Sequence, residues 1–280
     1  MNAKEISQAI ILGIKDYFKK NNFQKAVIGL SGGLDSTVTA YLAAKAIGNK
    51  NLTAVLMPDI GVTSQKSIKD AVEISKKLRI RYDIVSINKP VAFFNELSMN
   101  RRKNIFALGN VKARMRMIIL YYFANLNNAL VIGTSDKSEI ALGYTTKYGD
   151  NASDILVIGD LWKTQVIELG EYFGVPDKIL RKKPSAELIL NIDAEKELGL
   201  PYSVLDKILK MYIEEDLSLQ EITKKLSGKM RLEKEHFAKV IKRIKNNEHK
   251  RRSPMIIRLS DRSFHGMEWR MPITNRYEEE

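Results

Sequence analysis

The sequence predicts an α/β fold, built as a doubly wound, mostly parallel sheet with helices on both faces and a helical C-terminal extension. In the first part of the chain, continuous apolar runs of strand length alternate with helical patterns, which is typical of a parallel sheet covered on both sides. Beyond about residue 186 the strand patterns stop and helical ones continue. Because no repeat or low-complexity linker interrupts the chain, we expect one domain over residues 1–280, with an α/β core at 1–185 and the extension at 186–280.

The elements of the core follow one another regularly. Apolar side chains at helical spacing predict a helix over 3–20, and the run AVIGL predicts a buried strand over 26–30. A helix of small residues over 36–47 and a second strand over 52–57 follow, and Pro58 closes that strand. The later elements are a helix over 64–79, a strand over 82–87, two helical stretches and a strand, ALVIGT, over 129–134. The extension has helix starts, each preceded by turn or capping residues, near Pro201, Ser218 and Glu233.

The composition excludes several classes of protein. Apolar residues make up 44% of the 280 residues, as in an ordinary globular protein, and no apolar run is long enough to span a bilayer. The first residues lack the basic, apolar and cleavage regions of a secretion signal. Cysteine is absent, which excludes disulfides, thiolate catalysis and cysteine-built zinc sites. We therefore expect a cytoplasmic enzyme without membrane partners.

The formal net charge of +13 indicates affinity for anions. Many lysines lie at helical spacing, where they are solvated. A denser basic cluster lies between Lys224 and Arg258 and includes HKRRSP at 249–254. Such a cluster is compatible with nucleic acid or with a small phosphorylated ligand, and charge alone does not decide between them.

The most informative stretch reads VIGLSGGLDST and covers residues 27–37. A buried strand runs into two adjacent glycines and a helix begins near Asp35, so backbone N–H groups and hydroxyls can surround a phosphate. The Walker pattern is excluded because no lysine precedes the final hydroxyl residue, and the glycine spacing does not fit the dinucleotide fingerprint. An acid at a phosphate site is explained if Asp35 holds Mg²⁺ that neutralises the phosphates.

A second informative block begins with VIGTSDKSE at 131–139 and continues with GYTTKYGD at 143–150. Thr134 ends a strand at the carboxyl edge of the predicted sheet, where open α/β folds bind ligands. Glu139 lies on the following helix and is placed to face Asp35 as a second carboxylate on magnesium. A solvated helix acid is the ordinary alternative for Glu139.

These motifs resemble those of a known family. SGGLDS resembles the SGG-x-DS loop of the ATP pyrophosphatase superfamily, whose members cleave ATP between the α and β phosphates. The second block is similar to the pattern of ammonia-dependent NAD synthetases, and matches extend through almost the whole chain. Two departures are small, since Leu34 stands where glutamine is commoner and Ser185 where threonine is usual. The terminal segment 255–280 has no assigned role.

The resemblance implies roles for individual residues. The ATP-binding positions it implies are Gly29, Leu30, Ser31, Gly32, Gly33, Leu34, Asp35, Ser36, Thr134, Lys163 and Ser185. The positions implied for deamido-NAD (nicotinic acid adenine dinucleotide) are Arg114, Lys147, Asp154, His249 and Lys250. The implied magnesium ligands are Asp35 and Glu139, and no residue is implied as a covalent nucleophile.

The implied reaction is the ATP-dependent amidation of deamido-NAD to NAD through an adenylated intermediate, releasing AMP and pyrophosphate. Free ammonia, or ammonia from a separate partner, is the implied nitrogen source, since glutamine-using relatives need an extra domain with a catalytic cysteine. The resemblance also implies a homodimer, and no specific nucleic acid is expected. The alternatives are another ATP pyrophosphatase-type ligase, such as a GMP-synthetase-like subunit or a tRNA-modifying enzyme, and a regulatory module that binds ATP without turnover.

Overall fold

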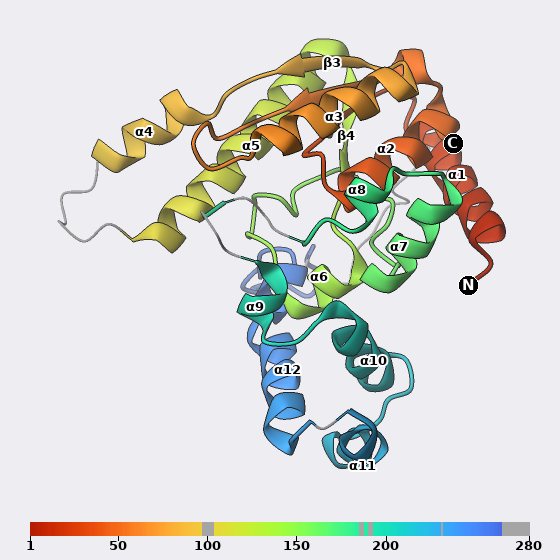
Figure 1. Cartoon of the computed structure of the whole chain (residues 1–280). Helices are drawn as coiled ribbons and strands as arrows, with labels where there is room; N and C mark the ends of the chain where they lie inside the picture. Colours follow the sequence, from red (N-terminus) through yellow and green to blue (C-terminus); the bar gives the residue numbers. More distant parts are fainter. Residues whose placement is uncertain (97–103, 185–187, 190–192, 231, 265–280) are drawn as a thin grey trace, which may run out of the picture.

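The computed structural model describes residues 1–96, 104–184, 188–189, 193–230 and 232–264. Its centre is a five-stranded parallel sheet in the order β3-β2-β1-β4-β5 (Figure 1). The strands are β1 (Lys25–Gly29), β2 (Leu52–Leu56), β3 (Arg81–Ile84), β4 (Ala129–Gly133) and β5 (Ile155–Leu156). The strand order reverses between β1 and β4, and open α/β sheets bind ligands beyond the carboxyl ends of the strands at such a switch point.

Helices cover both faces of this sheet. Alternate residues of β1 point to opposite sides, so Ile28 joins one apolar cluster and Val27 another. The first face carries α1 (Ala3–Lys20), α2 (Leu34–Ile47), α3 (Gln65–Leu78) and α7 (Lys163–Tyr172), with η1 (Asn49–Asn51) and α8 (Asp177–Leu180) beside them. The second face carries the long helix α5 (Ile105–Asn127), and α4 (Asn88–Glu96) packs against α5.

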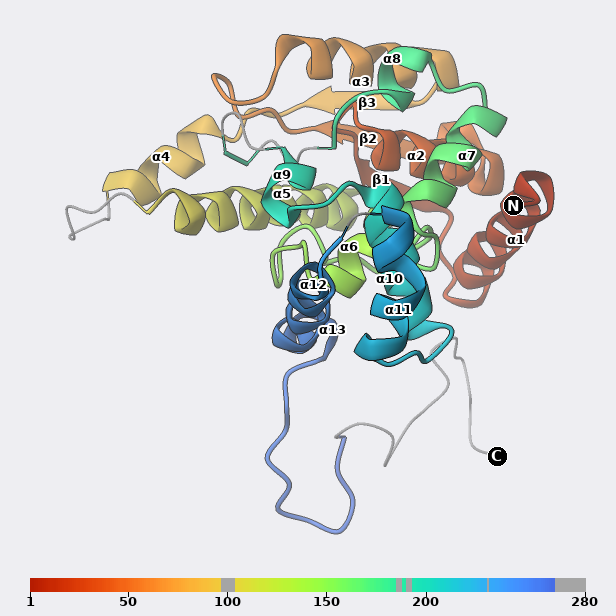
Figure 2. The ribbon, with the colours of Figure 1, turned by 60° about the horizontal axis from the view of Figure 1, so that its bottom comes forward.

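The extension is helical and packs on the core through α6 (Lys137–Leu142) and α7. Its helices, which form the lower part of Figure 1, are α9 (Ala194–Leu198), α10 (Tyr202–Ile213), α11 (Leu219–Met230), α12 (Lys234–Asn246) and α13 (Glu248–Arg251). Leu205 of α10 and Phe237 of α12 are fully buried in one apolar cluster with Leu142 and Trp162 of the core. Past α13, the chain leaves the helices as an exposed loop (Figure 2).

The predicted fold class is confirmed. The four expected strands form, with ends that match or differ by at most three residues. β1, β2 and β4 are buried along most of their length, as their apolar runs predict, whereas the edge strand β3 is exposed at both ends. Ser64 is the N-cap of α3 rather than its first residue, and its side chain accepts a hydrogen bond from the Ser67 N–H. The short strand β5 and the helix α7 were not predicted. No helix in the described ranges combines the length and apolar character that a bilayer crossing needs.

Candidate active site

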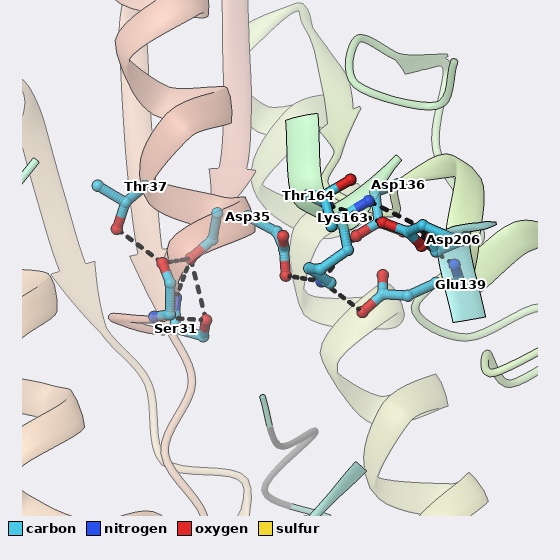
Figure 3. Close-up of polar contacts among 11 residues, drawn as sticks. Ser31, Asp35, Thr37, Asp136, Glu139, Lys163, Thr164 and Asp206 are labelled. Atoms are coloured by element: carbon cyan, nitrogen blue, oxygen red, sulfur yellow. Dashed lines mark hydrogen bonds and ion pairs between the residues drawn. The ribbon is translucent and has the colours of Figure 1, made fainter. Parts of the chain in front are cut away.

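The loop between β1 and α2 lies at the switch point and is folded on itself by its own hydroxyls. The Ser31 Oγ lies 3.0 Å from the Ser36 Oγ, and the Thr37 hydroxyl donates to the Gly33 carbonyl at 2.7 Å (Figure 3). Gly32 has φ +74°, and a Cβ there would lie 2.2 Å from the Ser67 carbonyl oxygen, so only glycine fits. The loop therefore presents backbone and the first turn of α2 to the space above the sheet.

Three carboxylates meet beside this loop. Asp35 comes from α2, Asp136 is the residue just before α6, and Glu139 lies on α6; oxygens of all three lie within 4.8 Å of one another. The Lys163 Nζ lies between them, 2.6 Å from Asp35, 2.7 Å from Asp136 and 3.2 Å from Glu139 (Figure 3). The sequence placed Asp35 and Glu139 opposite each other and Lys163 with ATP, and the structure brings all three together.

Burial sets the electrostatics of this acidic cluster, defined as Asp35, Asp136 and Glu139 with Lys163. Asp136 is inaccessible to solvent, and burial raises its pKa to about 6 against the opposing effect of Lys163. Burial also raises the pKa of Glu139, again opposed by Lys163. For Lys163, burial opposes the charged form, but the attraction of Asp136, Asp35 and Glu139 outweighs it and raises the pKa of the ammonium.

The acidic cluster fits a divalent cation. When ionised, the three carboxylates outweigh the one ammonium in charge, and carboxylate oxygens are the ligands that Mg²⁺ prefers. The Asp35 Oδ1 is buried and has no hydrogen-bond partner among the described residues, which leaves it free to act as a ligand. Asp35 and Glu139 therefore suit the predicted metal site, with Asp136 as a third carboxylate.

Asp136 was missed as a cluster member, although it lies within the second motif. Its side chain accepts a hydrogen bond from the Glu139 N–H at 2.8 Å and is the N-cap of α6. An aspartate that starts a helix is ordinarily a cap and no more. Here the same carboxylate also contacts Lys163, so one side chain fixes the start of α6 and the position of the ammonium.

A pocket of about 510 Å³ opens above the loop and the acidic cluster. Most of the predicted ATP-binding residues line it, namely Gly29, Leu30, Ser31, Gly33, Leu34, Asp35, Ser36, Thr134 and Lys163. Basic residues not singled out from the sequence, Arg181, Lys182 and Lys183, line it as well. The Lys182 Nζ donates to the Gly32 carbonyl at 3.2 Å, which ties this basic run to the loop. Ser185 lies outside the described residues.

A second pocket of about 180 Å³ adjoins the first, and both are lined by Tyr144, Asp150 and Leu188. Lys250 lines this second pocket, and its Nζ donates to the carbonyls of Gly143 at 2.7 Å and Thr145 at 2.8 Å. Burial lowers the pKa of Lys250, and the nearby Arg243 charge adds to the effect. Of the residues predicted to bind deamido-NAD, Lys250 is the one that lines either of these two pockets.

The other predicted deamido-NAD residues line neither pocket. The exposed Arg114 donates from its Nε to the Lys147 carbonyl at 3.3 Å, so these two lie side by side. The Asp154 carboxylate accepts hydrogen bonds from the Val131 N–H at 2.7 Å and the Tyr121 hydroxyl at 3.2 Å. His249 is exposed on α13. Their roles toward a substrate stay predictions.

The basic segment after α12 is docked on the core. The Arg251 guanidinium donates to the carbonyls of Ile140 at 3.0 Å and Ala141 at 2.7 Å, near the end of α6. Gly143 allows the close approach, since a Cβ there would lie 2.2 Å from the Asn247 Cβ. Arg251 thus anchors α13 to the core, a contact that was not predicted.

Comparisons with known proteins agree on one family. The family model described as NAD synthase matches residues 6–254. The NH(3)-dependent NAD(+) synthetase of Staphylothermus marinus is 41% identical over 249 residues, which cover 89% of each chain. The glutamine-dependent NAD(+) synthetase of Aquifex aeolicus is 40% identical, over 98% of this chain and 48% of that one. The NMN synthetase structure from Francisella tularensis superposes with a TM-score of 0.77 at 34% identity, covering 92% of this chain and 100% of that one.

Proposed function

This chain belongs to the NAD synthase family, and we propose that it amidates deamido-NAD to NAD with ATP and ammonia. The family resemblance found in the sequence motifs is confirmed. The observation that carries the reaction is the acidic cluster beside a glycine loop at the switch point of the sheet, inside a pocket large enough for a nucleotide.

The reaction is one of positioning and charge neutralisation. An oxygen of the nicotinate carboxylate attacks the α-phosphorus of ATP; the bond to the β-phosphate oxygen breaks and pyrophosphate leaves. Ammonia then attacks the activated carbonyl carbon, AMP departs with the C–O electron pair, and the nitrogen loses a proton to solvent. The glycine loop and the first turn of α2 offer N–H groups to the phosphates, and the Lys163 ammonium supplies positive charge beside them.

Asp35, Asp136 and Glu139 are the residues that we propose to hold Mg²⁺. A bound Mg²⁺ would offset charge on the phosphates of ATP. The buried Asp35 Oδ1 without a hydrogen-bond partner supports this proposal. No protein nucleophile is needed, in keeping with a sequence that contains no cysteine.

The nitrogen donor can be tested directly. We expect ammonium to support turnover and glutamine alone to give none, because these 280 residues contain no thiol that could release ammonia from glutamine. The chain matches about half of a glutamine-dependent relative. The test uses the purified chain, so that no other protein supplies ammonia from glutamine, and contaminating ammonia is removed. Glutamine-driven synthesis under those conditions would overturn the assignment.

Substrate length is the second open point, because the F. tularensis protein of similar fold is an NMN synthetase. The test supplies ATP, Mg²⁺ and ammonium with deamido-NAD or with nicotinate mononucleotide, and measures pyrophosphate release and the amidated product. We expect deamido-NAD to give the higher kcat/KM. A preference for the mononucleotide would change the substrate and keep the reaction. Release with neither acid would favour another ATP pyrophosphatase-type ligase or a binding module.

We also propose a cytoplasmic homodimer. Ile118, Tyr122 and Leu126 lie four residues apart on α5, and each is more than half exposed. Residues at this spacing form one stripe along a helix, and an exposed apolar stripe of this kind is typical of an interface. The opposite side of α5 packs on β1 and β4, so a second copy on the stripe would bury α5 on both sides. Sedimentation tests the proposed dimer: wild type should sediment as a dimer and Tyr122→Glu as a monomer. A wild-type monomer would contradict the proposal.

A further inference from the structure

Asp206 of α10 is a buried acid that lines neither pocket yet is bonded to the active-site helices. It is 5% exposed, and both of its oxygens are engaged. Its Oδ1 accepts a hydrogen bond from the Ser138 hydroxyl at 2.6 Å, and its Oδ2 accepts one from the Thr164 N–H at 2.8 Å (Figure 3). Burying a charged carboxylate without a directly bound cation costs free energy, and burial accordingly raises the pKa of Asp206.

The chain of hydrogen bonds continues to Lys163. The Ser138 Oγ accepts a hydrogen bond from the Lys163 N–H at 2.9 Å. Ser138 lies on α6 directly before Glu139, while Lys163 and Thr164 open α7. One carboxylate of the extension therefore joins the first turns of the two helices that carry Glu139 and Lys163.

The sequence at the start of α7 explains why an acid from another helix, Asp206 of α10, binds there. The N-cap of α7 is Trp162, whose indole offers no acceptor for the unpaired N–H groups of the first turn. Ser138 and Asp206 accept from the first two of these N–H groups instead, and a negative charge at this end also suits the helix dipole.

We propose that Asp206 is a positioning residue of the adenylation reaction: through Ser138 and the α7 backbone, it sets the place of the Lys163 ammonium against Glu139. The inference rests on the proposed function for its catalytic readout. Partners of this kind, one step behind the groups that bind a metal, typically change metal affinity or activity by about 10–100-fold when they are removed.

A matched control lies on the same helix. Glu214, the C-cap of α10, accepts hydrogen bonds from the Lys137 Nζ at 2.7 Å and the Trp162 Nε1 at 3.0 Å. Like Asp206, Glu214 joins the extension to α6 and to the start of α7. Unlike Asp206, it contacts only side chains there and is partly exposed. If the acids of α10 only hold the extension in place, loss of either one should have similar consequences.

The experiment compares Asp206→Asn and Ser138→Ala with Glu214→Gln. Each variant is assayed for thermal unfolding, for Mn²⁺ affinity without nucleotide by electron paramagnetic resonance, and for kcat and KM in pyrophosphate release. We expect Asp206→Asn and Ser138→Ala to lower kcat and weaken Mn²⁺ binding by about tenfold or more, with little change in the KM for ATP. Glu214→Gln should leave kcat and Mn²⁺ affinity within about twofold of wild type.

Ser138→Ala keeps the test decisive if Asp206→Asn does not fold, because it removes the link to Lys163 and leaves the Thr164 bond. Folded variants with wild-type kcat and Mn²⁺ affinity would overturn the proposal, as would equal losses in Glu214→Gln. Mn²⁺ binding separates the positioning role of Asp206 from the proposed function. If wild type releases no pyrophosphate, the proposed function fails, while Mn²⁺ affinity still shows whether Asp206 affects the acidic cluster.

Discussion

The α/β core and the helical extension contribute to the site in different ways. The core supplies side chains that face the main pocket, such as Ser31, Asp35 and Lys163, and it places them at the carboxyl ends of β1 and β4 or on the helix beside them. The extension adds Glu195 and Tyr202 to the wall of that pocket, but Asp206 and Arg251, which hydrogen-bond to the core, lie outside it. This difference indicates that the core carries the chemistry, while the extension fixes the geometry in which it operates.

The two regions are nonetheless tied by a shared apolar cluster. Leu142 and Trp162 belong to the core in sequence, but they pack with Leu209, Phe237 and other residues of the extension. Removing the extension would expose apolar surface on α6 and at the start of α7. We therefore expect the regions to unfold together, as one domain does.

The largest expected effect tests that coupling. Phe237 is inaccessible to solvent, and Phe237→Ala should lower the free energy of unfolding by about 3–5 kcal/mol through lost burial and a cavity. If the regions are coupled, urea unfolding followed by circular dichroism and by Trp162 fluorescence, in a Trp269→Phe background, should show one common transition. Two separate transitions in the variant would contradict the coupling of the two regions and show that the extension unfolds independently of the core.

The next effect concerns chemistry and should be confined to the core. Asp35→Ala and Glu139→Ala should each reduce the rate of adenylation by about a hundredfold or more, because each removes a carboxylate from the acidic cluster. Circular dichroism should show an intact fold, and pyrophosphate release gives the rate. Asp160→Asn is a suitable control, since that acid is 95% exposed and pairs with Lys137. Near-normal activity in either alanine variant would remove it from the metal site.

A smaller effect is expected where the extension reaches a pocket. Lys250→Ala should raise the KM for deamido-NAD by about tenfold and change the KM for ATP less, because Lys250 lines the second pocket. Arg252→Ala is the control, since Arg252 is 77% exposed and pairs with Glu248. Unchanged kinetics would make Lys250 a structural anchor only.

The same two variants test the nucleic-acid alternative in a salt titration of RNA binding. We expect binding of roughly micromolar affinity or weaker at physiological salt. Tight binding that Lys250→Ala abolishes, with unchanged dinucleotide kinetics, would favour an RNA-modifying enzyme.

The sequence predicted the core well because its signals are local. Buried parallel strands leave continuous apolar runs, and the loop at residues 31–36 carries glycines, hydroxyls and an acid in one short stretch. The strand β5 was missed because two half-buried residues, Ile155 and Leu156, leave no pattern. Asp136 lies within the second motif but was not predicted to join the acidic cluster, since an aspartate at the start of a helix is most simply a cap.

The contributions of the extension could not be predicted in the same way. Asp206 stands in the run YSVLDKILKMYI, where one acid among apolar residues has the pattern of a solvated position. Its burial depends on the start of α7, a helix more than thirty residues earlier that the sequence did not predict. Arg251 likewise meets carbonyls about 110 residues away. Contacts of this kind are set by tertiary packing, so the sequence around them carries no trace of them.

The smallest expected effect asks whether the core contains anchors of its own. The Asp154 carboxylate accepts from the Val131 N–H and the Tyr121 hydroxyl, so it pins the start of β5 to β4 and α5. Asp154→Asn and Tyr121→Phe should each lower the free energy of unfolding by about 1 kcal/mol, the usual contribution of one hydrogen bond. The resemblance also makes Asp154 a deamido-NAD residue, so a higher KM for that substrate is expected in Asp154→Asn alone. Urea titrations and steady-state kinetics of both variants separate the roles. Equal KM values in the two variants and wild type would leave Asp154 as an anchor, and the core would then resemble the extension in this one respect.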